Sequence, residues 1–289
     1  MDFISAAIQW VVDNLLLVVG IAVGVLVLFW LLGVLVGLLP DKPLPTVSDE
    51  PVDGPDAAAI AVGLIQIDNS NGSWNDITAR QLGASEKRQL QNMWGIADRQ
   101  SWLAQLESLA ANDRFDGPYE TLLGLRGEAM AAAGAKPTDK QWRAAIERAG
   151  LPVTGEVKSF IANVSRWEKM LHKTERVVVI PKDYAVTSLA GYSYGQGVAM
   201  ATWGVGFGFA EAAEAREIIA KFSAAARADF SGWEHLGRSY LLGRCLQMHR
   251  MTNGDNDKVE NQMIGSLTAY RRALNPKIDG PWARLPWAL

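Results

Sequence analysis

The apolar residues of this 289-residue chain fall into two different arrangements, one continuous and one periodic. Residues 15–39 form a continuous run without a charged side chain, made mostly of Leu, Val and Gly. A helix over this run is about 37 Å long at 1.5 Å per residue, which is enough to cross the ~30 Å hydrocarbon core of a bilayer. We therefore predict a single transmembrane helix over residues 15–39, preceded by a short N-terminal segment, residues 1–14.

A cleaved signal peptide is the alternative interpretation of this run. Signal peptides begin with basic residues and carry a shorter apolar stretch, whereas residues 1–14 contain Asp2 and Asp13 and no Lys or Arg. Lys42 is the only basic side chain close to the run, so the positive-inside rule favours a cytoplasmic location for the chain that follows. We expect a single-pass membrane protein whose first partner is the lipid bilayer.

A segment rich in proline and acidic residues follows the apolar run. Residues 40–56 read PDKPLPTVSDEPVDGPD. Proline interrupts both helices and strand ladders, and clustered acidic side chains repel one another. The composition predicts an extended linker over residues 40–56 that separates the membrane helix from the next domain.

Helical spacing dominates the remaining chain, residues 57–289. Thr138 and Gln141 are spaced as a capping box, and an apolar stripe predicts a second helix over residues 155–172. A further helix is predicted from four residues at helical spacing, Trp102, Leu103, Leu106 and Leu109. The only strand-like run, Val177–Ile180, is too short to form a sheet alone. The predicted fold is mainly α: a compact multi-helix soluble domain with at most minor β structure.

The stretch from Tyr184 to Ala210 contains no charged residue and has to be weighed as a second membrane span. It is poor in leucine and contains several hydroxyl-bearing residues. Its six glycines each lower helix stability by about 1 kcal/mol and permit close approach of neighbouring backbones. We interpret the stretch as a buried helix or helix pair inside the soluble core.

Composition excludes several kinds of function. The net charge is −3 and the isoelectric point is near 5.7, which argues against a nucleic-acid partner bound through a broad basic surface. A single cysteine excludes a disulfide framework and any site built from several cysteines. The three histidines lack metal-ligand spacing, and no phosphate loop or dinucleotide fingerprint is present. We predict no metal and no cofactor.

Several short motifs occur in order along the second part of the chain. They are Trp94–Trp102 (WGIADRQSW), Trp203-Gly204, the helix start AEAAEAREII, Phe230–Glu234 (FSGWE), Gly237–Arg244 (GRSYLLGR) and Pro281–Trp287 (PWARLPW). Through them, the chain from about residue 94 to residue 289 resembles the bacterial family named domain of unknown function 1266. The resemblance implies a bacterial, largely helical domain and supplies no activity. It also implies charged residues before the Trp-Gly pair, where this chain has the neutral Ser193, Gln196 and Thr202.

Arg244 is the residue that core packing explains least. It shares one helical face with Trp233 and Tyr240, and a buried guanidinium requires an acceptor. Two interpretations stay open: a structural ion pair with Asp98 or Asp183, and an anion-binding arginine in a pocket. Under the second interpretation the pocket residues are Arg244, Arg238, Tyr240, Asp98 and Asp183.

Local signals near the C-terminus have structural explanations. Ser231 and Glu234 are spaced as a capping box, which accounts for Glu234 without catalysis. Cys245 is expected to be a small buried apolar residue. Trp282 and Trp287 flank Pro286, and we expect this tail to pack back onto the domain and close its core.

Three functions stay open, and whether the chain is an enzyme is among the questions left undecided. The leading hypothesis is a membrane-anchored interaction or scaffolding protein that binds a protein partner or forms a homo-oligomer. It predicts a helical groove lined by aromatic residues. The second is an enzyme of an undescribed class with a concave polar pocket near Arg244. The third is a bacterial competition effector or its neutralising partner. The expected location is the bacterial inner membrane, with the soluble domain in the cytoplasm.

Overall fold

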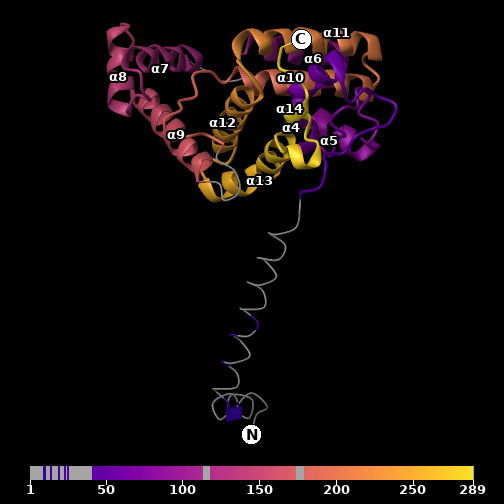
Figure 1. The fold of residues 1–289 in the computed structure, drawn as a ribbon, viewed down its shortest axis with the longest axis horizontal. Coiled ribbons are helices and arrows are strands. Elements are labelled where there is room, and N and C mark those ends of the chain that lie inside the picture. Colours follow the sequence, from indigo (N-terminus) through magenta and orange to yellow (C-terminus); the bar gives the residue numbers. More distant parts are fainter. Residues whose placement is uncertain are drawn as a thin grey trace. The chain divides into compact units, whose positions relative to one another are not determined.

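The computed structural model describes residues 9, 10, 14, 19, 23, 25, 41–112, 118–173 and 179–288. The chain divides into two units, residues 1–42 and 43–289. The helices of the second unit are α3 (Gly54–Ile60), η1 (Ala61–Gly63), α4 (Leu64–Asn69), α5 (Ala84–Trp94), α6 (Arg99–Ala111), α7 (Tyr119–Ala133), α8 (Asp139–Arg148), α9 (Gly155–His172), α10 (Ala190–Phe207), α11 (Ala212–Asp229), α12 (Trp233–Met251), α13 (Asn256–Ala273), η2 (Pro276–Ile278) and α14 (Pro281–Arg284). Figure 1 shows α7, α8 and α9 grouped on one side of this unit and α6, α10 and α11 together on the other.

The predicted membrane span cannot be compared directly with the structure. All of residues 15–39 except Val19, Val23 and Val25 lie outside the described residues. Among the residues that are described, no helix is both long enough and apolar enough to cross a bilayer. The transmembrane helix over residues 15–39 therefore stays a prediction from the sequence.

The mainly helical class of the fold is confirmed, and the described residues contain no β-strand. Of the strand-like run Val177–Ile180, the first two residues lie outside the described part of the chain. Val179 and Ile180 form a bend, and the Val179 amide donates to the Leu171 carbonyl at the end of α9. Val179 and Ile180 are therefore not part of a strand, since the described residues include no neighbouring strand to provide a hydrogen-bonding ladder.

The segment assigned to a linker differs from the prediction, because the second unit begins at Pro43 and not at Ala57. Leu44 is buried in the core. The buried Asn75 amide accepts a hydrogen bond from the Val47 backbone at 2.8 Å and donates to its carbonyl at 2.9 Å. Acidic residues of the segment form ion pairs with arginines of the unit, Asp49 with Arg80 and Glu50 with Arg216. These partners hold the segment against the unit despite its prolines.

Helix α10 is the buried centre of the unit, as expected for the uncharged stretch. It packs against α4, η1, α6, α11 and α12. At two of its glycines, aromatic rings of neighbouring helices occupy the space that a side chain would otherwise fill. A Cβ at Gly204 would lie 2.4 Å from the Trp102 ring of α6, and one at Gly197 would lie 2.3 Å from the Phe222 ring of α11. Because real Cβ atoms do not approach so closely, these glycines set how near α6 and α11 lie to α10.

Two predicted helix features are confirmed and one is wrong. Helix α9 spans the predicted residues 155–172, and the Thr138–Gln141 capping box starts α8. The capping box expected at Ser231 and Glu234 is absent, because Gly232 is the N-cap of α12 and makes no side-chain bond. Instead, Glu234 accepts from Arg238 at 2.5 Å, and the Ser231 hydroxyl lies 3.2 Å from Nδ1 of His235.

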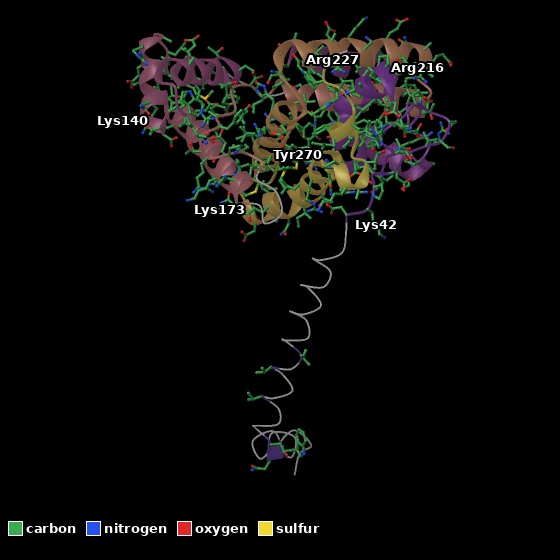
Figure 2. All side chains as sticks on the ribbon, viewed as in Figure 1. Lys42, Lys140, Lys173, Arg216, Arg227 and Tyr270 are labelled. Carbon is green, nitrogen blue, oxygen red and sulfur yellow. The ribbon has the colours of Figure 1, made fainter. Side chains whose placement is uncertain are left out.

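The C-terminal tail packs back onto the unit as expected. Trp282 stacks on Trp233 with ring centroids 5.5 Å apart, and Trp287 meets Trp233 edge-on at 4.8 Å. Each tail indole also donates to a backbone carbonyl, that of Ala61 for Trp282 and that of Phe230 for Trp287. Tyr270, labelled in Figure 2, contacts Trp282 edge-on at 6.0 Å. The tail thereby covers the ends of α12 and η1.

A buried ion pair links α7 and α9 to the segment that leads into α10. Both nitrogens of the Arg126 fork donate to Glu168 at 2.7 Å, and both side chains are almost fully buried. Glu168 also accepts from Lys136 at 2.6 Å and from the Val186 amide at 2.9 Å. Burial raises the pKa of Glu168, but Arg126 and Lys136 outweigh it, so the pKa of Glu168 is lowered overall. The pair is charged in the folded protein because each charge has its partner.

Replacing Gly204 by Ala tests the close approach of α6 to α10. The added methyl collides with the Trp102 ring, and overpacking of this kind costs about 1–3 kcal/mol of unfolding free energy. Gly124→Ala is the matched control, since nothing lies within 4 Å of a Cβ there and the change should add up to ~1 kcal/mol of helix stability. Urea denaturation of the full chain in mild detergent, followed by tryptophan fluorescence, measures both. Equal effects at the two positions would contradict the close contact.

Replacing Glu168 by Gln tests the buried ion pair. The change leaves Arg126 without its charge partner and should cost about 3 kcal/mol at pH 7. Because the folded pKa is lowered, the stability contributed by Glu168 is present above its unfolded pKa and is lost as the pH falls through the folded value. The stability gap between wild type and E168Q should therefore close in acid. Glu128→Gln, at an exposed position, should change stability by less than about 0.5 kcal/mol at either pH.

Candidate functional site

A groove with a volume of about 250 Å³ opens between α6 and α11, with α10 beneath it. Helix α6 runs antiparallel to α10, because Trp102 near its start donates to the Met200 carbonyl while Asn112 at its end accepts from Ser193. Helix α11 also runs antiparallel to α10, since the Phe222 ring covers Gly197 and Asp229 at the end of α11 accepts from Tyr194 near the start of α10. The two walls of the groove are therefore parallel helices.

The walls present matching sets of residues. Each wall contributes positions i, i+3, i+4 and i+7, and α10 contributes the floor. The lining residues are Leu103, Leu106, Glu107 and Ala110 from α6, Ile218, Lys221, Phe222 and Ala225 from α11, and Tyr194 from α10. All are apolar or aromatic except Glu107 and Lys221, one on each wall. Such a surface binds apolar groups and offers one charge of each sign.

Polar contacts close the two ends of the groove. At the start of the walls, Arg99 of α6 pairs with Glu214 of α11 at 2.6 Å, and this contact lowers the pKa of Glu214. At the other end, the Tyr194 hydroxyl donates to Asp229 at 2.6 Å. Burial raises the pKa of Tyr194, and the bond to Asp229 raises it further. Tyr194 is therefore a neutral phenol whose proton is committed to Asp229.

Of the five residues predicted for a pocket, Tyr240 and Arg244 are neighbours on α12, while Asp98 and Arg238 make their contacts elsewhere. Asp98 caps α6, accepting from the Ser101 amide at 2.8 Å, and this bond lowers its pKa. Asp183 lies in an exposed turn. Arg238 donates to the Val179 carbonyl at 2.8 Å and pairs with Glu234. None of the five lines the groove, and within the described chain neither aspartate pairs with Arg244.

Arg244 and Tyr240 are neighbours on α12, one turn apart. Tyr240 is buried and donates to Oε1 of Gln66 at 2.8 Å. Burial raises the pKa of Tyr240, while the charge of Arg244 opposes this rise. Nε of Arg244 is buried without an acceptor among the described residues. Neither Asp98, which caps α6, nor Asp183, which lies in an exposed turn, pairs with Arg244 among the described residues.

Other chemistry is sparse in the described part of the chain. No cluster of three or more His, Cys, Asp or Glu side chains there is arranged to hold a metal. Burial raises the pKa of the Cys245 thiol, which keeps it protonated and makes it a poor nucleophile. At the positions where family resemblance implied charges, Ser193 bonds Asn112 and Thr202 bonds the Ala199 carbonyl. Gln196 is buried, and its Oε1 has no donor among the described residues.

Sequence reasoning did not locate the groove, because it used Leu103 only as one of four residues whose helical spacing predicts a helix. The structure leaves Leu103 42% exposed, while Trp102 and Leu109 of the same helix are fully buried. The signal was present in two stretches of α6 and α11 that carry three apolar residues and one charge at helical spacing. Periodicity identifies an apolar stripe, but it does not say whether another helix covers that stripe.

Comparison with known proteins identifies the family and no relative of known activity. A family model described as a protein of unknown function, DUF1266, matches residues 89–287. No curated protein and no solved structure matches the chain. The matched range contains both walls and the floor of the groove.

Replacing Arg244 by Met tests whether this arginine has a structural partner. Nε of Arg244 has no hydrogen-bond partner among the described residues, so the free energy of unfolding should change by less than about 1 kcal/mol. Arg126→Met is the matched comparison and should cost about 3 kcal/mol, because it removes the main partner of buried Glu168. Urea denaturation of the full chain in mild detergent measures both variants. A comparable loss for Arg244→Met would mean that Arg244 holds an essential contact.

Proposed function

We propose that this chain, which belongs to the DUF1266 family, is a membrane-anchored interaction protein that binds a protein partner in the groove between α6 and α11. The groove is the observation that carries the proposal. It is concave and largely apolar, and exposed apolar concavities in folded proteins commonly bind ligands or partners. Both walls lie within the residues matched by the family model.

The composition of the groove favours binding over catalysis. Its polar groups are Glu107 and Lys221 on the walls and the Tyr194 hydroxyl on the floor. The Tyr194 proton is already donated to Asp229, so the floor offers no free general acid. Apolar wall residues supply binding energy through the area they bury, and rim charges supply selectivity.

The membrane anchor is the second part of the proposal and is supported by residues 15–39. Their uninterrupted apolar character fits a single-pass helix, and Lys42 favours a cytoplasmic unit. Only residues 40–42 separate the proposed span from the compact unit, because the unit begins at Pro43. Such a protein would recruit its partner to the bacterial inner membrane, acting alone or as a homo-oligomer.

The alternative functions have less support. An enzyme with an anion-binding pocket near Arg244 would bring the aspartates or Arg238 to that arginine, and their contacts lie elsewhere. The unsatisfied Nε of Arg244 is the one observation that favours an anion site. A competition effector or its neutralising partner would also use a binding groove, and no residue distinguishes that role from general scaffolding.

Substitution of Leu103 by Asp tests the proposal. Leu103 is exposed enough for the change to leave the fold intact, and the new carboxylate would lie in the apolar groove. We expect a partner that co-purifies stoichiometrically with the tagged wild type to be lost with Leu103→Asp and with Ile218→Asp on the opposite wall. The experiment uses full-length protein solubilised mildly from membranes that retain it after carbonate extraction.

Met93→Asp is the control for this experiment. Met93 is 61% exposed on α5 and does not line the groove, so its replacement should retain the partner. Loss of the partner from all three variants, or from none, would contradict binding in the groove. Recovery of the protein in the carbonate-soluble fraction would contradict the anchor.

A further inference from the structure

The two walls of the groove carry opposite charges at its middle, and this arrangement selects one kind of occupant. We infer that the occupant is an amphipathic helix of a partner protein, with a basic side chain on the flank that faces α6 and an acidic side chain on the flank that faces α11. This inference rests on the proposed function, because it specifies the partner that the groove binds. It follows from the spacing of the lining residues, from the open side of the groove and from the exposure of Glu107 and Lys221.

The spacing of the apolar residues along each wall suits the packing of a third helix. The apolar residues of α6 and α11 recur at three and four positions, so each wall presents the ridges that a third helix packs against. The lined part of each wall covers eight residues, whose seven rises of 1.5 Å span about 10 Å, the length of two helical turns. Grooves between helices bind amphipathic helices through side chains at i, i+3, i+4 and i+7.

The groove is open along its side. Leu103 at one end and Ala110 at the other end of the α6 wall are both exposed. A rod-like segment can therefore enter sideways over its whole length. An acyl chain would leave one side in water in such a groove, which forfeits part of the apolar burial that drives its binding.

The two charges in the middle of the groove are available for a partner. Glu107 and Lys221 are both exposed, and neither forms an ion pair or hydrogen bond within the described residues. By contrast, Arg99 and Glu214, which belong to the same two helices, pair directly with each other. A helix with one basic and one acidic flank would satisfy both charges, whereas flanks of a single sign would meet one repulsive wall.

Synthetic helical peptides test this inference. Three labelled 18-residue peptides share one leucine stripe and differ in their flanks: one Lys flank and one Glu flank, Lys on both, or Glu on both. Fluorescence anisotropy measures their binding to the full-length chain in phosphatidylcholine nanodiscs, with empty nanodiscs as the background. The mixed peptide satisfies both walls in one of its two directions, so the comparison does not depend on the direction of binding.

We expect the mixed peptide to bind wild type roughly two- to fivefold more tightly than either peptide of a single sign, the range for one exposed ion pair. Glu107→Lys should make the all-Glu peptide the tightest binder, and Lys221→Glu should make the all-Lys peptide the tightest. Leu103→Asp should weaken all three peptides at least fivefold. It also serves as the control for binding outside the groove.

Each other outcome overturns a stated part of the inference. Groove-dependent binding with an unchanged order of peptides in the charge variants would remove the role of Glu107 and Lys221. If no peptide binds but the native partner is still lost with Leu103→Asp, the occupant is not such a helix and the proposed function stands. Self-association of the chain that Leu103→Asp abolishes would make a second copy the occupant. If no peptide binds and Leu103→Asp does not release the native partner, the groove is not a binding site.

Discussion

The rest of the structure depends on the burial of α10, a helix without a single charge. A helix buried on all sides has to be enclosed by other helices, and here α4, η1, α6, α11 and α12 enclose it. Glycines make this enclosure close, because aromatic side chains of the neighbours occupy the space where Cβ atoms would lie. Trp102 fills the space at Gly204, Phe222 at Gly197 and Tyr240 at Gly195. The stability lost through glycine in a helix is offset by the aromatic surface that these contacts bury.

The groove is a consequence of this enclosure. Trp102 and Phe222 fix α6 and α11 on α10 through two different glycines, and each of these helices then has a second apolar stripe that faces the other helix. The two helices pair directly where Arg99 meets Glu214, and beyond that point the groove lies between them. Phe222 therefore both holds its wall and lines it, while Trp102 holds its wall next to the lining residue Leu103. Packing of the core and binding in the groove are coupled through α10.

The part of the unit that contains α7, α8 and α9 is held by a buried ion pair. Arg126 and Glu168 bring charge into the interior, where their mutual contact, the Lys136 ammonium and hydrogen bonds to the Val186 backbone offset desolvation. The Trp142 ring lies 4.7 Å from the Arg126 guanidinium and adds a cation–π contact. This network joins α7, α8 and α9 to the segment that enters α10. Directional hydrogen bonds and ion pairs therefore position α7, α8 and α9. Close packing of aromatic rings against glycines positions α6 and α11.

Local signals in the sequence determined the helical class, the bounds of α9, the Thr138 capping box, the buried state of α10 and the returning C-terminal tryptophans. Each depends on residues close together in the chain or on an unbroken composition, and the proposed membrane helix belongs to the same kind of inference. Tertiary structure alone decided what depends on long-range pairing. Arg126 and Glu168 lie 42 residues apart, and Asn75 holds Val47 through bonds that no periodicity encodes. Whether the apolar stripe at Leu103 would be covered or left open depended on how α6 and α11 both pack against α10, so the groove exists only in three dimensions.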